Sequence, residues 1–578
     1  MILLFLLYFS SSLWGQSRDV TEYVDSMIGN SDSRWMQFPG PAMPFGMVKL
    51  SPDNQGNVWR GGYEYKINQI IGFSHIHSWT MGGLLTMPVT GPLKIKPGEE
   101  NEPDSGYRSR INHKNEKASL SYYSVLLDDY NIKAELTSTT RTGFQRYTFP
   151  KSDSSRILFD LENGSEYPYE VRWASISKVS DYEIEGFSTQ SSYDEPTNLL
   201  NDYTVYFVAR VDKPMKSFGT WVNGYVDTTS SICWGRHDIG AFMNFNTEEG
   251  EIIQLKTAIS YVSIEQARKN LEVESGGFGW NFDAVRKYAV NEWRKILSTI
   301  EIEGGTEEDK RKFYTNLYRS YCSRTIFSDV DGQYVDMYER TQQLKDPASP
   351  IYGCDAFWNT FWNLNQLWAL ATPDIMNKWV ESLLEYYRVG GWLPNGPLGV
   401  EYCDIMGAQH EIPLMVSAYQ KGIRNYDVDK AYEAVKKTLT TQGTALSSGG
   451  IVGNRHLDVY LKYGFVPYGE KSHHNVFGTT YEGPTSNTLE YAFDDWNAAQ
   501  FAKALGYEED YDYFTRRAYN YKNVFDSETK YVRPKYSDGT WMPDFEPINK
   551  DEHSTSWSWL GSGSVSYTHL TLPTSDLV

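Results

Sequence analysis

The sequence predicts a multidomain α+β protein, with an N-terminal β-sandwich followed by a C-terminal ring of paired helices. At 578 residues the chain is too long for one ordinary hydrophobic core. From about Val20 to Ala258, short segments alternate apolar and polar residues between Gly, Pro, Asn and Asp clusters, which is typical of sandwich strands. Beyond Ala258 the hydrophobic period changes to that of amphipathic helices.

The N-terminal run Met1–Leu13 is apolar but too short to span a bilayer. It resembles the apolar part of a secretory signal peptide, although no Lys or Arg precedes it. We therefore assign residues 1–15 to a signal peptide and expect cleavage near Gly15–Gln16. The expected location is a bacterial periplasm or the outside of the cell.

Residues 16–262 are assigned to the sandwich because each predicted strand is short and bounded by turn residues. The clearest strands are Ser119–Leu127, Ile132–Thr137, Gly143–Phe149, Arg156–Leu161, Tyr203–Val211 and Ile252–Ser260.

Residues 263–305 read as a helical linker, in which Phe282–Leu297 carries one apolar stripe. Thr306 followed by Asp309 is an N-cap signature that opens the helical domain, residues 306–564. Further helices are predicted near Phe357–Leu370, Asp374–Arg388, Gln409–Gln420, Val428–Thr441, Thr488–Leu505 and Glu509–Phe525. A closed ring of six helical hairpins needs about twelve helices and roughly seven are readable, so we expect an (α/α)6 barrel that is incomplete in this chain.

The last residues, 565–578, do not read as part of a fold. The run Val565–Thr574, VSYTHLTLPT, follows a Gly/Ser stretch and resembles a translated sequencing-library adapter. Such segments are excluded from fold reasoning, and we expect the natural protein to continue differently beyond about Ser564.

Composition excludes several classes of protein. A formal charge of −20 argues against nucleic-acid binding, which needs clustered cations. A hydrophobic content of 40% excludes a multi-span membrane protein. The 18 Trp, 43 Tyr and 26 Phe fit either a large aromatic core or rings that stack on sugars.

The four cysteines show no metal-binding or redox spacing. They are Cys233, Cys322, Cys354 and Cys403. An exported chain permits disulfides, but we favour buried free thiols.

Four stretches together resemble glycoside hydrolase family 92, a family of exo-acting α-mannosidases. They are Pro39–Asp53 (PGPAMPFGMVKLSPD), Tyr352–Asn363 (YGCDAFWNTFWN), Gly391–His410 and Thr488–Trp496 (TLEYAFDDW). The resemblance runs from about Asp19 to Trp557.

The resemblance implies a sandwich packed on an (α/α)6 barrel, with the active site at their junction. It also implies calcium-dependent hydrolysis of α-mannosides from glycans with inversion, in which one carboxyl protonates the leaving oxygen and another activates water. The GNEP-type and DDxGQ-type motifs that carry these carboxyls in the family do not occur in this sequence. The catalytic residues and calcium ligands are therefore unassigned, and we expect the printed chain itself to be inactive.

Two alternatives stay open: a non-catalytic carbohydrate-binding protein, and a glycosidase of the same fold that acts on another sugar.

The substrate-facing positions of the family do have counterparts. Phe45 and Gly46 match a sandwich loop that closes over the terminal sugar, where Phe45 would stack and Gly46 would let the backbone approach closely. The alternative is an ordinary turn with a buried Phe. Trp79, in HIHSWTMGG, matches a loop on the leaving-group side or is simply a loop Trp.

Asn359 stands where the family carries an Asp that binds sugar hydroxyls. Asn offers one acceptor and two donors without charge. Asp355, four residues earlier, either replaces that carboxylate or caps a helix. His410 matches a family histidine and either bonds a hydroxyl or supports its loop.

Two further groups of titratable residues read as structural. His75 and His77 are two apart, with no Cys or carboxylate recognisable beside them in sequence. The acidic residues Glu490, Asp494 and Asp495 suggest acid–base chemistry, but the family uses this stretch mainly for helix packing.

Overall fold

The computed structural model describes most of the chain between residues 19 and 543. The described residues are 19–32, 37–56, 61–78, 81–162, 169–194, 199–354, 357, 360–397, 399–402, 408–446, 450–470 and 484–543. The predicted signal peptide, residues 565–578, Trp79, Asp355, Asn359 and Cys403 lie outside them.

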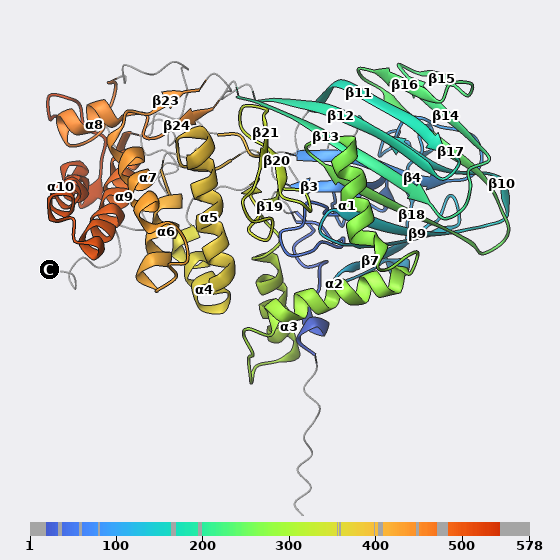
Figure 1. Cartoon of the computed structure of the whole chain (residues 1–578), viewed down its shortest axis with the longest axis horizontal. Coiled ribbons are helices and arrows are strands. Elements are labelled where there is room, and N and C mark those ends of the chain that lie inside the picture. Colours follow the sequence, from blue (N-terminus) through green and yellow to red (C-terminus); the bar gives the residue numbers. More distant parts are fainter. Residues whose placement is uncertain are drawn as a thin grey trace, which may run out of the picture.

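Two antiparallel sheets form the N-terminal domain, at the right of Figure 1. The seven-stranded sheet has the order β1 (Ser51–Asp53), β3 (Gly72–Ser78), β4 (Met81–Val89), β10 (Ser152–Asp160), β17 (Ile239–Thr247), β14 (Ser217–Val222) and β15 (Tyr225–Asp227). The nine-stranded sheet has the order β16 (Ile232–Gly235), β11 (Tyr169–Ser180), β12 (Glu183–Asp194), β13 (Leu199–Val211), β18 (Glu251–Ser260), β9 (Thr142–Phe149), β8 (Ile132–Ser138), β7 (Tyr122–Leu127) and β6 (Lys117–Ser119).

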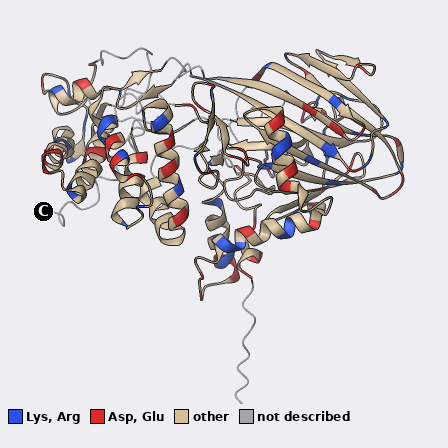
Figure 2. Ribbon diagram, in the orientation of Figure 1, with Lys and Arg blue, Asp and Glu red and all other residues tan. Residues whose placement is uncertain are grey.

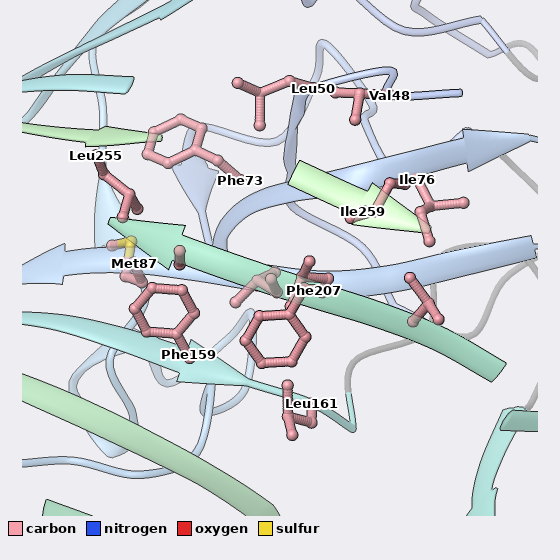
Figure 3. Close-up of a cluster of buried hydrophobic side chains, with 14 of the residues drawn as sticks. Val48, Leu50, Phe73, Ile76, Met87, Phe159, Leu161, Phe207, Leu255 and Ile259 are labelled. Atoms are coloured by element: carbon pink, nitrogen blue, oxygen red, sulfur yellow. The ribbon is translucent and has the colours of Figure 1, made fainter. Parts of the chain in front are cut away.

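The facing sides of the two sheets form the core of the sandwich. Figure 3 shows side chains of both sheets in it, among them Phe73 and Met87 from one and Phe207 and Leu255 from the other. These four are at most marginally accessible to solvent. Alternation of apolar and polar residues therefore identified the sandwich correctly, because each strand turns one face inward.

Three helices connect the sandwich to the helical domain: α1 (Ile264–Gly276), α2 (Phe282–Leu297) and α3 (Glu307–Arg319). Helix α1 lies on the outer face of the nine-stranded sheet, against β18 and β13. The N-cap of α3 is the predicted one, with a reciprocal capping box between Thr306 and Asp309.

Seven further helices form the C-terminal domain at the left of Figure 1. They are α4 (Leu364–Ala371), α5 (Pro373–Gly390), α6 (Glu411–Gln420), α7 (Val428–Thr440), α8 (Leu457–Tyr463), α9 (Pro484–Leu505) and α10 (Glu508–Ala518). Helix α9 packs against α6, α7 and α10, which makes it the centre of this part of the domain. Among the described residues, no helix has the length and apolar character needed to cross a bilayer.

Short elements complete the fold. The two-residue and three-residue strands outside the sandwich sheets are β2 (Gln69–Ile70), β5 (Ser109–Arg110), β19 (Thr325–Ile326), β20 (Gln333–Val335), β21 (Thr341–Gln343), β22 (Tyr352–Gly353), β23 (Thr444–Ala445), β24 (Ile451–Val452), β25 (Phe525–Asp526) and β26 (Tyr531–Val532). The 3₁₀ helices are η1 (Val20–Tyr23), η2 (Pro103–Ser105), η3 (His113–Asn115), η4 (Thr360–Trp362) and η5 (Tyr519–Val524).

Candidate functional site

The loop before β1 joins the sandwich to the helical domain through Phe45. Its ring centroid lies 5.2 Å from that of Trp379, 5.5 Å from Tyr352 and 5.7 Å from Tyr321. The side chain is 3% exposed, and the backbone N–H donates to the carbonyl of Tyr321 at 2.9 Å. In this structure Phe45 is thus a packing residue at the domain junction, as in the buried-Phe alternative, and its contact with sugar stays a prediction.

Gly46 follows in the same loop and is crowded by its own chain. A Cβ atom there would lie 2.9 Å from the carbonyl oxygen of Val48, so local packing alone favours glycine. The Gly46 carbonyl accepts a hydrogen bond from Nζ of the buried Lys49 at 3.1 Å. Lys49 Nζ also donates to Thr325 Oγ1 at 2.6 Å and Ser78 Oγ at 3.1 Å, which ties the sandwich to the chain after α3.

The two histidines of β3 are structural, but the sequence argument for this was incomplete. A carboxylate does accompany them: Asp53 of the neighbouring strand β1 lies 2.9 Å from His77 Nε2. Nδ1 of His77 lies 2.7 Å from the Lys49 carbonyl, so both ring nitrogens are used. Burial lowers the pKa of His75 to about 4, which keeps that ring neutral.

Helices α6 and α9 bring four titratable side chains together: His410, Glu411, Glu490 and Asp494, hereafter the α6–α9 acidic cluster. His410 precedes α6, and its Nε2 lies 2.8 Å from Glu490 Oε2. Burial lowers the pKa of His410, but the charge and hydrogen bond of Glu490, with the nearby Asp494, outweigh burial and raise it overall. The cluster therefore holds a His–Glu ion pair in the interior.

Glu411 and Asp494 make this cluster unusual. Glu411 is fully buried, and no described neighbour donates a hydrogen bond to either carboxyl oxygen. Burial raises its pKa to about 8, and only its own backbone N–H offsets this. Asp494 accepts the backbone N–H of Gln409 at 2.8 Å through Oδ2, and burial raises its pKa well above the usual range. The carboxyl of Glu411 is therefore protonated at neutral pH.

Further buried polar atoms of α9 and of the segments before α6 and α8 lack a hydrogen-bond partner among the described residues. They are Oε1 of Gln409, both amide atoms of Asn454, Nδ1 of His456 and Oγ1 of Thr485. The Gln409 amide reaches the Gly453 carbonyl at 3.3 Å, so the segment preceding α8 lies beside the start of α6. Buried polar groups are normally paired, and several unsatisfied ones together are typical of a place that receives a polar ligand or ordered water.

Glu411 was not among the candidate site residues predicted from the sequence. A carboxylate in the first turn of a helix usually reads as a group that stabilises the helix dipole at the surface. The signal that identifies it is its neighbourhood, because EIPLMVSAYQ is otherwise an almost fully apolar helix whose first residue is also buried.

Asp495 is different from its neighbour Asp494. It accepts hydrogen bonds from Tyr460 and from Nε of Arg517, both at 3.0 Å, which tie α9 to α8 and α10. The helix-packing interpretation of TLEYAFDDW is supported for this residue.

Trp79, Asp355 and Asn359 lie outside the described residues, so their roles stay predictions. Cys233 and Cys322 are buried free thiols, as expected for these two, and Cys354 is buried as well. Among the described side chains, no three His, Cys, Asp or Glu residues are placed to bind one metal ion. Calcium stays a prediction from the resemblance.

The comparisons with known proteins cover both domains. Residues 23–260 match the glycosyl hydrolase family 92 N-terminal domain, and residues 266–571 match the glycosyl hydrolase family 92 catalytic domain. A curated relative, an uncharacterized secreted glycosidase of Arthroderma benhamiae, is 24% identical over 566 residues, which cover 90% of this chain. The chain spans 66% of the length of that relative.

Two solved structures from Bacteroides thetaiotaomicron have the same fold. The family GH92 α-mannosidase BT3965, in complex with mannoimidazole, matches with a TM-score of 0.81 and 30% identity over 92% of this chain and 67% of its own. The family GH92 inverting mannosidase BT2199 matches with a TM-score of 0.79 and 25% identity over 92% of this chain and 69% of its own.

Proposed function

Because this chain belongs to glycosyl hydrolase family 92, we propose that the protein is an exported, exo-acting glycoside hydrolase that removes mannose from α-mannosides of glycans with inversion. The observation that carries the proposal is the match of both domains to a structure that binds mannoimidazole, at 30% identity. Export is supported by the apolar N-terminal run and by a relative named as secreted.

Inversion needs an acid and a base carboxyl far enough apart to hold water, and the two motifs that carry these carboxyls in the family do not occur in this sequence. The role of the α6–α9 acidic cluster in this proposal is therefore to bind and orient the sugar. Glu411 is protonated at neutral pH, so its carboxyl can donate one hydrogen bond to a hydroxyl and accept another. Oδ1 of Asp494 has no partner among the described residues and can take part in a further hydrogen bond. The unsatisfied amide of Asn454, which follows the Gly453 carbonyl that Gln409 contacts, adds donors and acceptors.

His410 would act as a positioning residue in this scheme. Its ion pair with Glu490 fixes the start of α6 and therefore the place of Glu411. This favours the loop-supporting alternative for His410 over direct contact with a hydroxyl.

A second candidate function has one observation in its favour. Asn359 replaces the family's Asp and removes a charged acceptor from the expected terminal-sugar subsite. Charge-assisted hydrogen bonds are the stronger kind, so this change favours a same-fold glycosidase with another sugar preference, or a carbohydrate-binding protein without activity.

The test is a panel of aryl α-glycosides assayed with the product of the complete gene. We expect kcat/KM to be highest for the α-mannoside. A higher value for another sugar would support the second candidate, and binding of mannose without turnover of any substrate would support a non-catalytic protein. Asn359→Asp is the matched variant, because it restores the family's residue without changing side-chain size.

A further inference from the structure

Two tryptophans lie exposed on the outer face of the nine-stranded sheet. Trp173 of β11 is 40% exposed and Trp234 of the edge strand β16 is 62% exposed. Their ring centroids are 5.3 Å apart, with an angle of 33° between the ring planes. Single exposed apolar side chains need no explanation, but a contiguous pair of the largest aromatic side chain marks a binding surface.

The pair continues into a row of side chains across four strands. Trp234 is the cross-strand partner of Ser175, Ser175 of Phe187, and Phe187 of Tyr206. Cross-strand partners point to the same face of a sheet, so these four side chains share the outer face. Ile176 and Phe207, which follow Ser175 and Tyr206 in the chain, point to the opposite face and are buried in the core.

The neighbouring row adds hydroxyl groups beside the rings. Trp173 is the cross-strand partner of Thr189, and Thr189 that of Thr204. The two threonine hydroxyls lie 2.8 Å apart. We define the aromatic platform as Trp173, Trp234, Phe187, Tyr206 and the hydroxyl side chains Ser175, Thr189 and Thr204.

The charge distribution indicates what kind of partner fits the platform. None of its seven side chains is charged, and Figure 2 shows mostly tan ribbon along the strands that Figure 1 labels β11 and β16. The next residue on the same face of β12, Glu185, is paired with Arg268. The formal net charge of the chain is −20. This charge disfavours binding of an anionic polymer or of a second copy of the same chain to the platform.

We propose that the aromatic platform is a second carbohydrate site, which holds a neutral glycan chain while the junction of the two domains acts on its end. Aromatic faces stack on the C–H faces of pyranose rings, and the threonine and serine hydroxyls bond the equatorial oxygens. Strand spacing of about 4.8 Å makes the row from Trp234 to Tyr206 roughly 14 Å long, enough for more than one sugar ring. The choice of a neutral glycan rests on the proposed function, but the platform itself is separate from the α6–α9 acidic cluster.

The experiment is native gel electrophoresis of the full chain with soluble α-mannan in the gel, repeated with isolated variants. We expect mannan to retard the parent protein, and the double variant Trp173→Ala/Trp234→Ala to need at least tenfold more mannan for the same retardation. Trp280→Ala is the matched control, because Trp280 is 37% exposed but lies outside the platform, under Lys256 Nζ at 4.0 Å. It should behave as the parent does.

Two further variants separate stacking on a ring from non-specific apolar contact. Trp234→Phe keeps a flat ring and should keep most of the retardation, whereas Trp234→Leu keeps apolar area and should lose it. Unchanged melting temperatures verify that each variant is folded, as expected for exposed side chains.

Three results would overturn the proposal. The first is equal retardation of the parent and the double variant, and the second is no retardation of the parent. The third is a dimer of the parent in analytical ultracentrifugation that is absent in the double variant, because a second copy would then be the occupant. Hydrolysis of aryl mannosides is measured separately, so a failed platform and a failed function give different patterns.

Discussion

Glu411→Gln should stabilise the protein at neutral pH, although it removes a buried functional group. The side chain is fully buried, and burial raises its pKa from 4.5 to about 8. The folded state therefore binds a proton more strongly than the unfolded state between these two values. Stability contributed by this protonation is fully present below about pH 4.5 and is lost as the pH rises through about 8. Glutamine has nearly the same shape and never ionises, so the variant escapes this loss.

The magnitude follows from the pKa difference. One pKa unit corresponds to about 1.4 kcal/mol. A pH of 7 lies about 2.5 units above the ordinary pKa of 4.5 and still below the folded-state pKa of about 8. The variant should therefore gain about 3 kcal/mol of unfolding free energy at this pH. A pH of 5 lies only about half a unit above the ordinary pKa, so the gain in unfolding free energy should fall below about 1 kcal/mol.

The assay is guanidinium unfolding followed by tryptophan fluorescence, at pH 5 and pH 7, for the parent and the variant. Glu433→Gln is the control, because Glu433 lies on α7 with 56% exposure. Its unfolding free energy should change by less than about 0.5 kcal/mol at either pH. A gain for Glu411→Gln that is equal at both pH values, or a loss at pH 7, would refute the reasoning.

Four other outcomes are expected. Phe45→Ala should cost about 3–5 kcal/mol because it opens a cavity among three aromatic rings at the junction; a loss below 1 kcal/mol in the same unfolding assay would show that the ring is not needed there. Asp495→Asn should cost about 3–5 kcal/mol because it leaves Arg517 buried without its counter-charge, and an unchanged melting temperature would contradict this. A chelator should abolish glycosidase activity and added calcium should restore it; full activity in excess chelator would show that calcium is not required. Asn359→Asp should change the ranking of aryl glycosides by kcat/KM with little change in melting temperature; an untouched ranking would make Asn359 a packing residue.

Much of the fold could be predicted because its elements are locally encoded. The strands at Ile132–Ser138 and Thr142–Phe149 and the helix Phe282–Leu297 lie within a residue or two of their expected bounds. Tyr288 of α2 is 40% exposed, so this helix packs on a narrower face than its apolar residues suggest. Helix α8 was missed, since seven residues carry too little periodicity to recognise.

The predicted helix Phe357–Leu370 was only partly correct. The structure has a 3₁₀ turn, η4, at Thr360–Trp362, and α4 begins at Leu364. An apolar and aromatic run fits a short 3₁₀ turn as well as an α-helix, because tertiary packing can override local propensity.

The site was less predictable because its chemistry comes from residues that are distant in sequence. Asp53 pairs with His77 across two strands, and Glu490 pairs with His410 across 80 residues. Spacing rules detect partners within one strand or one helical turn, so neither pair could be read from the chain alone. The raised pKa of Glu411 could not be predicted for a related reason, because it arises from burial, which the identity of a residue does not reveal.

Proton NMR during hydrolysis of an α-linked mannobiose by the product of the complete gene tests the central claim most directly. It reports in one spectrum which sugar is released, from which end, and in which anomeric form. The account predicts that β-mannose appears first and that α-mannose follows only by mutarotation, because inversion places the new hydroxyl on the opposite face of the ring. Initial release of α-mannose, or no release of mannose under conditions in which another α-glycoside is cleaved, would contradict it.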